Sequence, residues 1–260
     1  MPAPVGMRPD GKPYGAGIYP AKLPECPSNG LVLYKDYDAA EIEKLTPLVA
    51  SEAFQAQRAA DTSYYRAYKL MRELGERPDD YLWALLQASW QTDARPELRT
   101  RYLTELAEAS ASVPARFADV QWLGMEGRAI NALRELGRFD EAAARLAKVS
   151  LGGLKAKPVA ASPSSQEMRL ARNRRGWLDY YASLGAAIAR KDASPEPFDM
   201  IPRSVALGKC IDDAAKLGEG QRAFCDSVAV KADIDKLRAR RAAAKAETDA
   251  LRRSREEAGR

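Results

Sequence analysis

The side chains that most often perform catalysis or bind metal ions are scarce in this chain of 260 residues. Histidine is absent, and there are three cysteines, Cys26, Cys210 and Cys225. Most metal sites and nucleophile–base pairs are built from these two residue types. Carboxylates, lysines and tyrosines remain as acids and bases, but no two of them occur at a spacing that a particular reaction requires. The sequence therefore predicts a protein that is not an enzyme and holds no metal and no cofactor.

Cys26 lies in a turn, Cys26-Pro27-Ser28-Asn29-Gly30, that resembles half of a zinc-ribbon knuckle. Asn29 stands where such a knuckle has its second cysteine, and no other cysteine or histidine is near. One thiolate cannot complete a tetrahedral site. We expect the turn to persist without metal and Cys26 to remain a free thiol.

The other two cysteines, Cys210 and Cys225, flank the turn Gly218-Glu219-Gly220, at nine and six residues from Glu219. On two packed helices the two cysteines would be offset by about 4 to 5 Å along the helix axes, a difference that helix tilt can partly compensate. Two outcomes stay open on the sequence alone. A disulfide would indicate an oxidising compartment such as the periplasm, whereas two buried thiols are typical of a cytosolic protein.

The cellular location of the protein is predicted from the length of its apolar runs and from its first residues. No apolar run reaches the roughly 18 residues that cross a bilayer, so we expect no membrane insertion. The opening MPAPVGMRPDGKPYG lacks the basic region and the apolar core of a secretory signal. As written, the chain is expected in the cytoplasm, with the periplasm as the alternative if an export segment has been processed or removed.

The clearest structural signal is a pair of helices over residues 119–149. Apolar residues recur at spacings of three and four in the first helix, Gly137 ends it, and a second helix follows with its own apolar stripe. The first stripe consists of Trp122, Met125, Ala129, Leu133 and Leu136, and the second of Ala142, Leu146 and Val149. Two short helices of this kind bury their stripes against each other, which predicts a helical hairpin.

Residues 136–142, LGRFDEA, resemble the turn and second helix of a tetratricopeptide (TPR) repeat. A second hairpin is predicted over 62–90, closed by Gly75, and another helix over 96–110. Gly75 and Gly137 are 62 residues apart, close to two repeats of about 34 residues. Residues 20–150 also resemble bacterial proteins that carry a Cys-Pro-x-x-Gly turn ahead of TPR-like helices, a resemblance that implies no particular activity. It does imply an all-α solenoid of stacked hairpins.

Composition divides the chain into five segments. Residues 1–30 hold seven of the sixteen prolines and five of the seventeen glycines, which excludes a long helix there. We expect an irregular arm over 1–37, the TPR-like array over 38–150, a Gly/Pro/Ser-rich linker over 151–165, a second helical segment over 166–230 and a long charged helix over 231–260.

Two basic clusters raise the question of an anionic ligand. The tail 231–260 has ten Lys/Arg against six Asp/Glu and no aromatic residue, so nucleic-acid binding is disfavoured. The other cluster suits a phosphate, a carboxylate terminus or an RNA backbone, unless its arginines spread around the helix and pair with acids on adjacent helices. It consists of Arg169, Arg172, Arg174 and Arg175.

The first functional hypothesis is a scaffold for protein–protein interaction, with a partner peptide or helix in the groove of the array. Residues on the first helices of two hairpins are predicted to line this groove, namely Tyr65, Lys69, Arg72, Arg128, Asn131 and Arg134. The alternatives are an enzyme that works with carboxylates such as Glu73, Asp79 and Glu126, for example a lyase or a glycan-acting enzyme, and a weak nucleic-acid binder. The identity of the partner is not encoded in these patterns.

Overall fold

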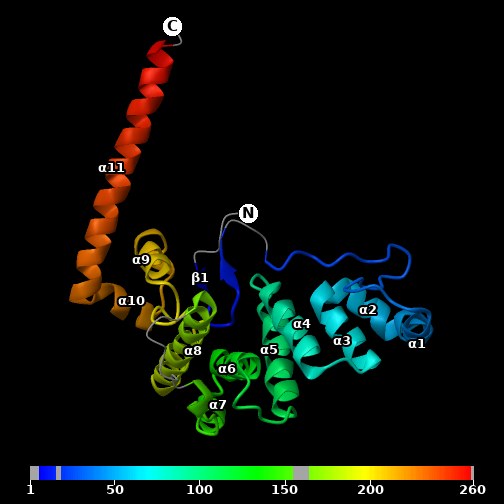
Figure 1. Cartoon of the computed structure of the whole chain (residues 1–260). Helices are drawn as coiled ribbons and strands as arrows, with labels where there is room; N and C mark the ends of the chain where they lie inside the picture. Colours follow the sequence, from blue (N-terminus) through cyan, green and yellow to red (C-terminus); the bar gives the residue numbers. More distant parts are fainter. Residues whose placement is uncertain (1–5, 16–18, 155–163, 259–260) are drawn as a thin grey trace. The chain divides into compact units, whose positions relative to one another are not determined.

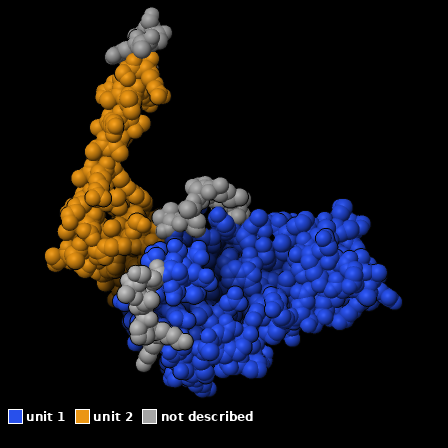
Figure 2. All heavy atoms as spheres, viewed as in Figure 1, with its two compact units in different colours: residues 1–195 blue, residues 196–260 orange. Residues whose placement is uncertain are grey.

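The computed structural model describes residues 6–15, 19–154 and 164–258, with the side chains of the last helix described as far as residue 255. This part of the chain contains eleven α-helices and one two-stranded sheet, so the predicted all-α fold class is confirmed. The chain divides into two compact units, Met1–Pro195 and Glu196–Arg260, called here the first and second unit (Figures 1 and 2).

The first unit contains eight helices among its described residues. They are α1 (Ala39–Ala50), α2 (Glu52–Ala60), α3 (Ser63–Leu74), α4 (Pro78–Trp90), α5 (Pro96–Ala111), α6 (Val120–Glu135), α7 (Phe139–Leu146) and α8 (Ser165–Ala189). From α3 to α8 each helix packs on the next. In addition α1 contacts α3, α4 contacts α6, and α6 contacts α8. Helices α4, α6 and α8 therefore contact one another in that order, and we call the surface that they share the α4–α6–α8 face.

Local sequence signals explain where these helices begin and end. Asp38 caps α1 in a reciprocal capping box with Glu41, and Asp119 accepts hydrogen bonds from the first amides of α6. Gly75 and Gly137 adopt φ values of +75° and +73°, the left-handed conformation that closes a helix. Both predicted helix stops are confirmed.

The described residues before α1 form two segments that hydrogen bonds hold in place. Strand β1 (Gly6–Met7) pairs with β2 (Pro13–Tyr14) in an antiparallel hairpin. Farther along, the Cys26 turn is closed by a hydrogen bond from the Gly30 amide to the Cys26 carbonyl, and Cys26 is a free thiol. Side chains of the helices bind the described main chain of this arm: Arg66 of α3 donates to the Gly30 carbonyl and Tyr180 of α8 to the Pro9 carbonyl.

The two units differ from the five segments that composition predicts. Helix α8 packs on α6 and α7, so it belongs to the first unit, and the division falls between Pro195 and Glu196. The predicted linker 151–165 contains a short 3-10 helix, Gly152–Leu154, while its residues 155–163 lie outside the described part. This arrangement cannot be predicted from composition, because the apolar stripe of α8 packs against helices that precede the linker.

The second unit contains α9 (Arg203–Asp212), a 3-10 turn (Ala214–Lys216), α10 (Glu219–Asp226) and α11 (Val228–Ala258). A disulfide joins Cys210 of α9 to Cys225 of α10, with their Cα atoms 5.8 Å apart. Helix α11 begins before the predicted Lys231 because Ser227 accepts its first amide hydrogen bonds. Val230 and Ile234 near its start are buried, and most of the helix beyond them is exposed.

The disulfide makes a direct prediction for the number of reactive thiols. We expect the protein, taken from its source cells, denatured without reductant and alkylated, to gain the mass of one label, on Cys26. Reduction before alkylation should raise the gain to three labels. Three labels without reduction would contradict the bridge.

Candidate functional site

The α4–α6–α8 face has two adjacent halves, one covered by the N-terminal hairpin and one open. Trp90, Arg128 and Tyr180 from the three helices contact or adjoin the hairpin. Trp83, Arg128 and Trp177 from the same helices line the open half. Two aromatic pairs connect the halves, Trp83 with Trp90 at 5.6 Å and Trp177 with Tyr180 at 5.3 Å between ring centroids. Arg128 stands at the boundary.

The covered half holds the hairpin by its main chain. The Tyr180 hydroxyl donates a hydrogen bond to the Pro9 carbonyl at 2.9 Å, and the Trp90 indole N–H donates to the Asp10 carbonyl at 3.3 Å. Lys12 in turn donates its ammonium to the Trp90 carbonyl at 2.6 Å. The Pro9 and Asp10 carbonyls both belong to the turn between β1 and β2, so this half binds the hairpin at its turn.

A network of buried charges fastens the same hairpin. The Asp10 carboxylate is 1 % exposed and pairs with Arg8 at 2.8 Å and with Arg99 at 3.1 Å. Arg99 also pairs with Glu135 of α6 at 2.7 Å, and Arg8 and Lys12 both pair with Asp93. Burial raises the pKa of Glu135, and Arg99 opposes that rise. The hairpin therefore supplies charged groups that pair with buried charges of the fold.

The open half is a pocket of about 440 Å³. Its lining combines two tryptophans with polar groups from all three helices, including Asp79, Trp83, Gln121, Arg128, Asn173 and Trp177. Trp83 is 42 % exposed, although it is one of the largest apolar side chains. An exposed indole beside an arginine is more typical of a binding surface than of a hydrophobic core.

Arg128 is held between the two indoles without a charged partner. Its guanidinium carbon lies 5.0 Å from the Trp177 ring centroid and 5.8 Å from that of Trp83. One N–H group donates to the Gly124 carbonyl of its own helix at 3.0 Å, and its buried Nε has no hydrogen-bond partner among the described residues. Burial is the main cause that lowers the pKa of Arg128, and neighbouring tyrosines and Asp10 offset it only in part.

Gly11 explains how the hairpin approaches this arginine. A Cβ atom at Gly11 would lie 2.5 Å from Arg128 Nε, so the hairpin comes this close only because residue 11 has no side chain. Gly11 also has a φ of +87°, which favours glycine. The bound hairpin therefore shields one edge of Arg128, and the pocket borders the rest.

The prediction that six residues line one groove is wrong. Tyr65, Asn131 and Arg134 are buried, and Lys69 and Arg72 line a separate pocket of about 330 Å³ beside α2 and α3. Among the six, only Arg128 lines the pocket on the α4–α6–α8 face. In a regular array of hairpins, α3 and α6 would both be first helices with the same exposed side. The additional helix α5 instead places α6 in one row with α4.

Arg134 and Asn131 have a structural role instead. The Arg134 guanidinium donates to the carbonyls of Asp192 and Ser194, which follow α8, and to the Asn131 side chain at 3.0 Å. Asn131 in turn donates to Glu135 at 3.1 Å. These bonds attach the segment after α8 to the interior of α6, as expected for buried polar groups that need partners.

Tyr65 and Lys69 belong to a cluster around Glu105 of α5. The Glu105 carboxylate accepts hydrogen bonds from Tyr65 at 2.7 Å, Tyr68 at 2.9 Å and Lys69 at 2.7 Å. Burial, the largest single influence, raises the pKa of Glu105, but Lys69 and the tyrosines outweigh it and the pKa lies below its usual value of 4.5. The carboxylate form is thus stabilised by the fold.

This cluster predicts a pH-dependent stability. Glu105→Gln should lower the free energy of unfolding by about 1 kcal/mol at neutral pH, because charged hydrogen bonds are lost. Since the folded pKa is the lower one, the benefit is present above the unfolded pKa and disappears as the pH falls through the folded pKa. Urea titrations at neutral and acid pH should show the gap between wild type and variant closing in acid. A gap that widens in acid would contradict the assignment.

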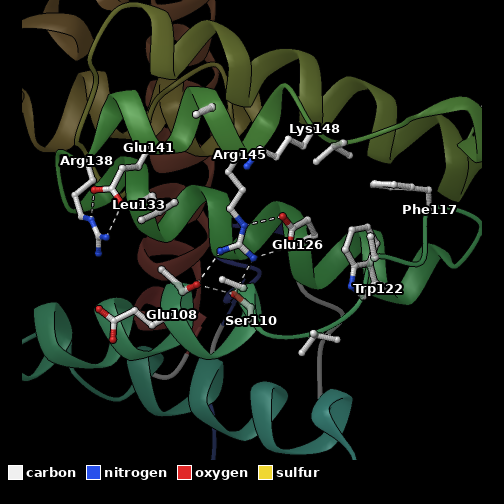
Figure 3. Close-up of a pocket in the computed structure, with 16 residues that line it drawn as sticks. Glu108, Ser110, Phe117, Trp122, Glu126, Leu133, Arg138, Glu141, Arg145 and Lys148 are labelled. Atoms are coloured by element: carbon white, nitrogen blue, oxygen red, sulfur yellow. Dashed lines mark hydrogen bonds and ion pairs between the residues drawn. The ribbon is translucent and has the colours of Figure 1, made fainter.

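A further pocket, of about 480 Å³, lies between α5, α6 and α7 and is lined by Trp122 and Leu133 among others (Figure 3). Its most prominent charges are already paired. Arg145 pairs with Glu126 at 2.6 Å and donates to the Ala107 carbonyl at 2.7 Å, while Arg138 pairs with Glu141 at 2.6 Å. These paired arginines connect α7 to α5 and α6. They are therefore not available as partners for a ligand in this pocket.

The acids of the alternative enzymatic hypothesis are not brought together. Glu73 lines the pocket beside α2 and α3, Asp79 lines the pocket on the α4–α6–α8 face, and Glu126 lines the pocket of Figure 3. General acid–base chemistry requires two such groups around one substrate. The arrangement of these three side chains gives that hypothesis no support.

The basic cluster lies on α8, next to the open pocket. Arg169, Arg172 and Arg175 are exposed and Arg174 is half-buried. Arg175 pairs with Asp179 of its own helix at 3.5 Å, and the other three have no ion pair with a described residue. The expected pairing with acids on adjacent helices is thus not seen. Asn173 from the middle of this cluster lines the pocket.

Sequence reasoning missed Trp83 and Asp10. The signal for Trp83 was present, because the core positions Leu82, Leu85 and Leu86 of α4 leave residue 83 on another side of the helix. Asp10 lies in a segment without helical periodicity and pairs with residues far along the chain, so no local pattern indicates its burial.

Comparison with models of known protein families gives no match, and neither do comparisons with curated proteins and with solved structures. Within the described ranges, no helix is long and apolar enough to span a membrane, and no three Cys, Asp or Glu side chains are grouped so that they could hold a metal ion. The functional argument therefore starts from the geometry of the α4–α6–α8 face.

Proposed function

We propose that this protein is a non-enzymatic scaffold that binds an extended segment of a partner protein on its α4–α6–α8 face, and that α1 to α8 form a TPR-like array. The observation that carries the proposal is the hairpin of residues 6–14, whose turn is already held on half of this face through the main-chain carbonyls of Pro9 and Asp10. The packing of alternate helices, α4 on α6 and α6 on α8, supports the repeat-like organisation.

The open half has the features that a partner segment needs. It continues the covered half along the same three helices, it exposes Trp83, and it contains Arg128 without an ion pair to a described residue. Aromatic and arginine side chains supply most of the binding energy in many protein interfaces. A partner segment that follows the hairpin's path would bury them.

We further propose that the protein works in an oxidising compartment such as the periplasm. The Cys210–Cys225 disulfide supports this placement over the cytoplasm, where thiols are kept reduced. The single-label result predicted for the unreduced protein is its test.

Selection from a display library of random linear peptides tests the scaffold function. The full chain serves as bait, and each enriched peptide is then measured against Trp83→Ala and against Ile42→Ala, which removes a similarly exposed apolar side chain from α1. We expect binding to the wild type and to Ile42→Ala, and at least a tenfold loss, about 1.4 kcal/mol, with Trp83→Ala. Peptides that bind both variants equally would contradict the proposed face.

A further inference from the structure

We infer that the open pocket on the α4–α6–α8 face recognises an acidic peptide, with one carboxylate seated against Arg128 between Trp83 and Trp177. The inference rests on the proposed function, which it deepens by giving the chemistry of the partner segment. Three observations carry it: the missing carboxylate partner of Arg128, the two indole walls and the pairing of the pocket's own acids with arginines.

Arg128 differs from three other buried or half-buried arginines of the first unit, whereas Arg134 resembles it in having no ion pair with a described residue but donates to main-chain carbonyls. Arg66 pairs with Glu25 at 2.7 Å, Arg99 with Glu135 at 2.7 Å and Arg145 with Glu126 at 2.6 Å. Arg128 has no carboxylate within ion-pair distance among the described residues, and the part of its guanidinium that Gly11 leaves uncovered borders the pocket. A partly buried charge without a partner is costly, and a ligand carboxylate would supply that partner.

The indole walls strengthen such a contact. Trp83 and Trp177 lie on the guanidinium at 5.8 and 5.0 Å, which holds its orientation by cation–π attraction. A peptide that covers the exposed ring of Trp83 would also exclude water from the ion pair. Charge–charge attraction increases as water is removed, so the aromatic and the charged contact reinforce each other.

The charges at the rim favour a segment with more than one acid. The pocket's own acids are already paired, Asp80 with Arg77 at 2.9 Å and Asp79 with Arg116. On α8, by contrast, Arg169 and Arg172 have no ion pair with a described residue. Neither arginine lines the pocket, but Arg169 lies one helical turn before Asn173, which does, so an acid that flanks the anchoring residue has a cation within one turn of α8.

The same face already binds peptide main chain, and this decides between an acidic peptide and an acidic sugar polymer. Residues 6–14 are held through the carbonyls of Pro9 and Asp10 by Tyr180 and Trp90, whose rings contact Trp177 and Trp83 of the pocket. A peptide in the adjoining pocket would contact indoles of the same two helices, α4 and α8, that already hold this main chain. A sugar polymer would have to be recognised by the pocket alone.

Two fluorescent pools of short synthetic peptides provide the test. One pool carries Asp or Glu at alternate positions, and the matched pool carries Asn or Gln there, with the same small and apolar residues elsewhere. Anisotropy titrations against the full chain should give a Kd for the acidic pool that is at least about tenfold lower. Arg128→Gln should remove this preference, whereas Arg138→Gln should keep it, because Arg138 lines the separate pocket of Figure 3 and pairs with Glu141 there.

The outcomes separate the two proposals. If both pools bind equally and both lose binding in Trp83→Ala, the acidic specificity is wrong and the peptide-binding function stands. If neither pool binds and an acidic oligosaccharide or single-stranded RNA does, both proposals are wrong. The pool comparison uses the wild-type protein, so it decides the question even if circular dichroism shows that Arg128→Gln folds poorly.

Discussion

Asp10→Ala should lower the free energy of unfolding of the first unit by about 4 kcal/mol, the largest single-residue effect that we predict. The carboxylate is buried and pairs with Arg8 and Arg99, so its removal leaves two buried guanidinium groups with fewer partners. It also weakens the attachment of the hairpin. Urea unfolding followed by tryptophan fluorescence measures this directly, because all four tryptophans belong to the first unit.

Asp36→Ala is the matched control for Asp10. Asp36 is exposed on the segment before α1, and its replacement should change the free energy of unfolding by less than about 0.5 kcal/mol. If Asp10→Ala is as stable as Asp36→Ala, residues 6–14 do not hold the place on the α4–α6–α8 face that we describe.

Arg134→Met should lower the free energy of unfolding by about 3 kcal/mol. Methionine fills a similar length but cannot donate, so the carbonyls of Asp192 and Ser194 and the Asn131 oxygen lose their buried donor. The predicted consequence is early release of the segment after α8. Hydrogen exchange at the amides around residues 190–195 should therefore increase before the rest of the first unit unfolds.

Arg172→Met is the matched control for Arg134. Arg172 is exposed on α8 and has no ion pair with a described residue, so the same substitution should leave the stability within about 0.5 kcal/mol of wild type. Equal stability of the two variants would show that Arg134 is solvated, as the hypothesis of a groove-lining arginine requires.

Helix identity was predictable here because its causes are local. Gly75 and Gly137 end their helices by their own backbone conformation, and Asp119 caps α6 through amides two and three residues away. Such signals act within a few residues, so they are visible in the sequence. The all-α class follows from them.

The binding surface was not predictable in the same way. Whether Arg134 or Arg128 faces solvent depends on which row of helices contains α6, and this depends on α5, whose place in the array no local pattern gives. Likewise, Asp10 and Arg99 are 89 residues apart in the chain, and nothing near either of them indicates the pair. Long-range packing decides exposure, and exposure decides which residues can bind.

The most direct test of the central claim is photo-crosslinking from the open pocket in the source cells. Trp83→p-benzoylphenylalanine places the crosslinker on the α4–α6–α8 face, and Ile42→p-benzoylphenylalanine places it on an equally exposed site of α1. We predict that position 83 crosslinks to a discrete linear segment of a partner protein, identified by mass spectrometry of the digested adduct, and that position 42 does not. Equal and scattered crosslinking from both positions would contradict the proposal that this face binds a partner.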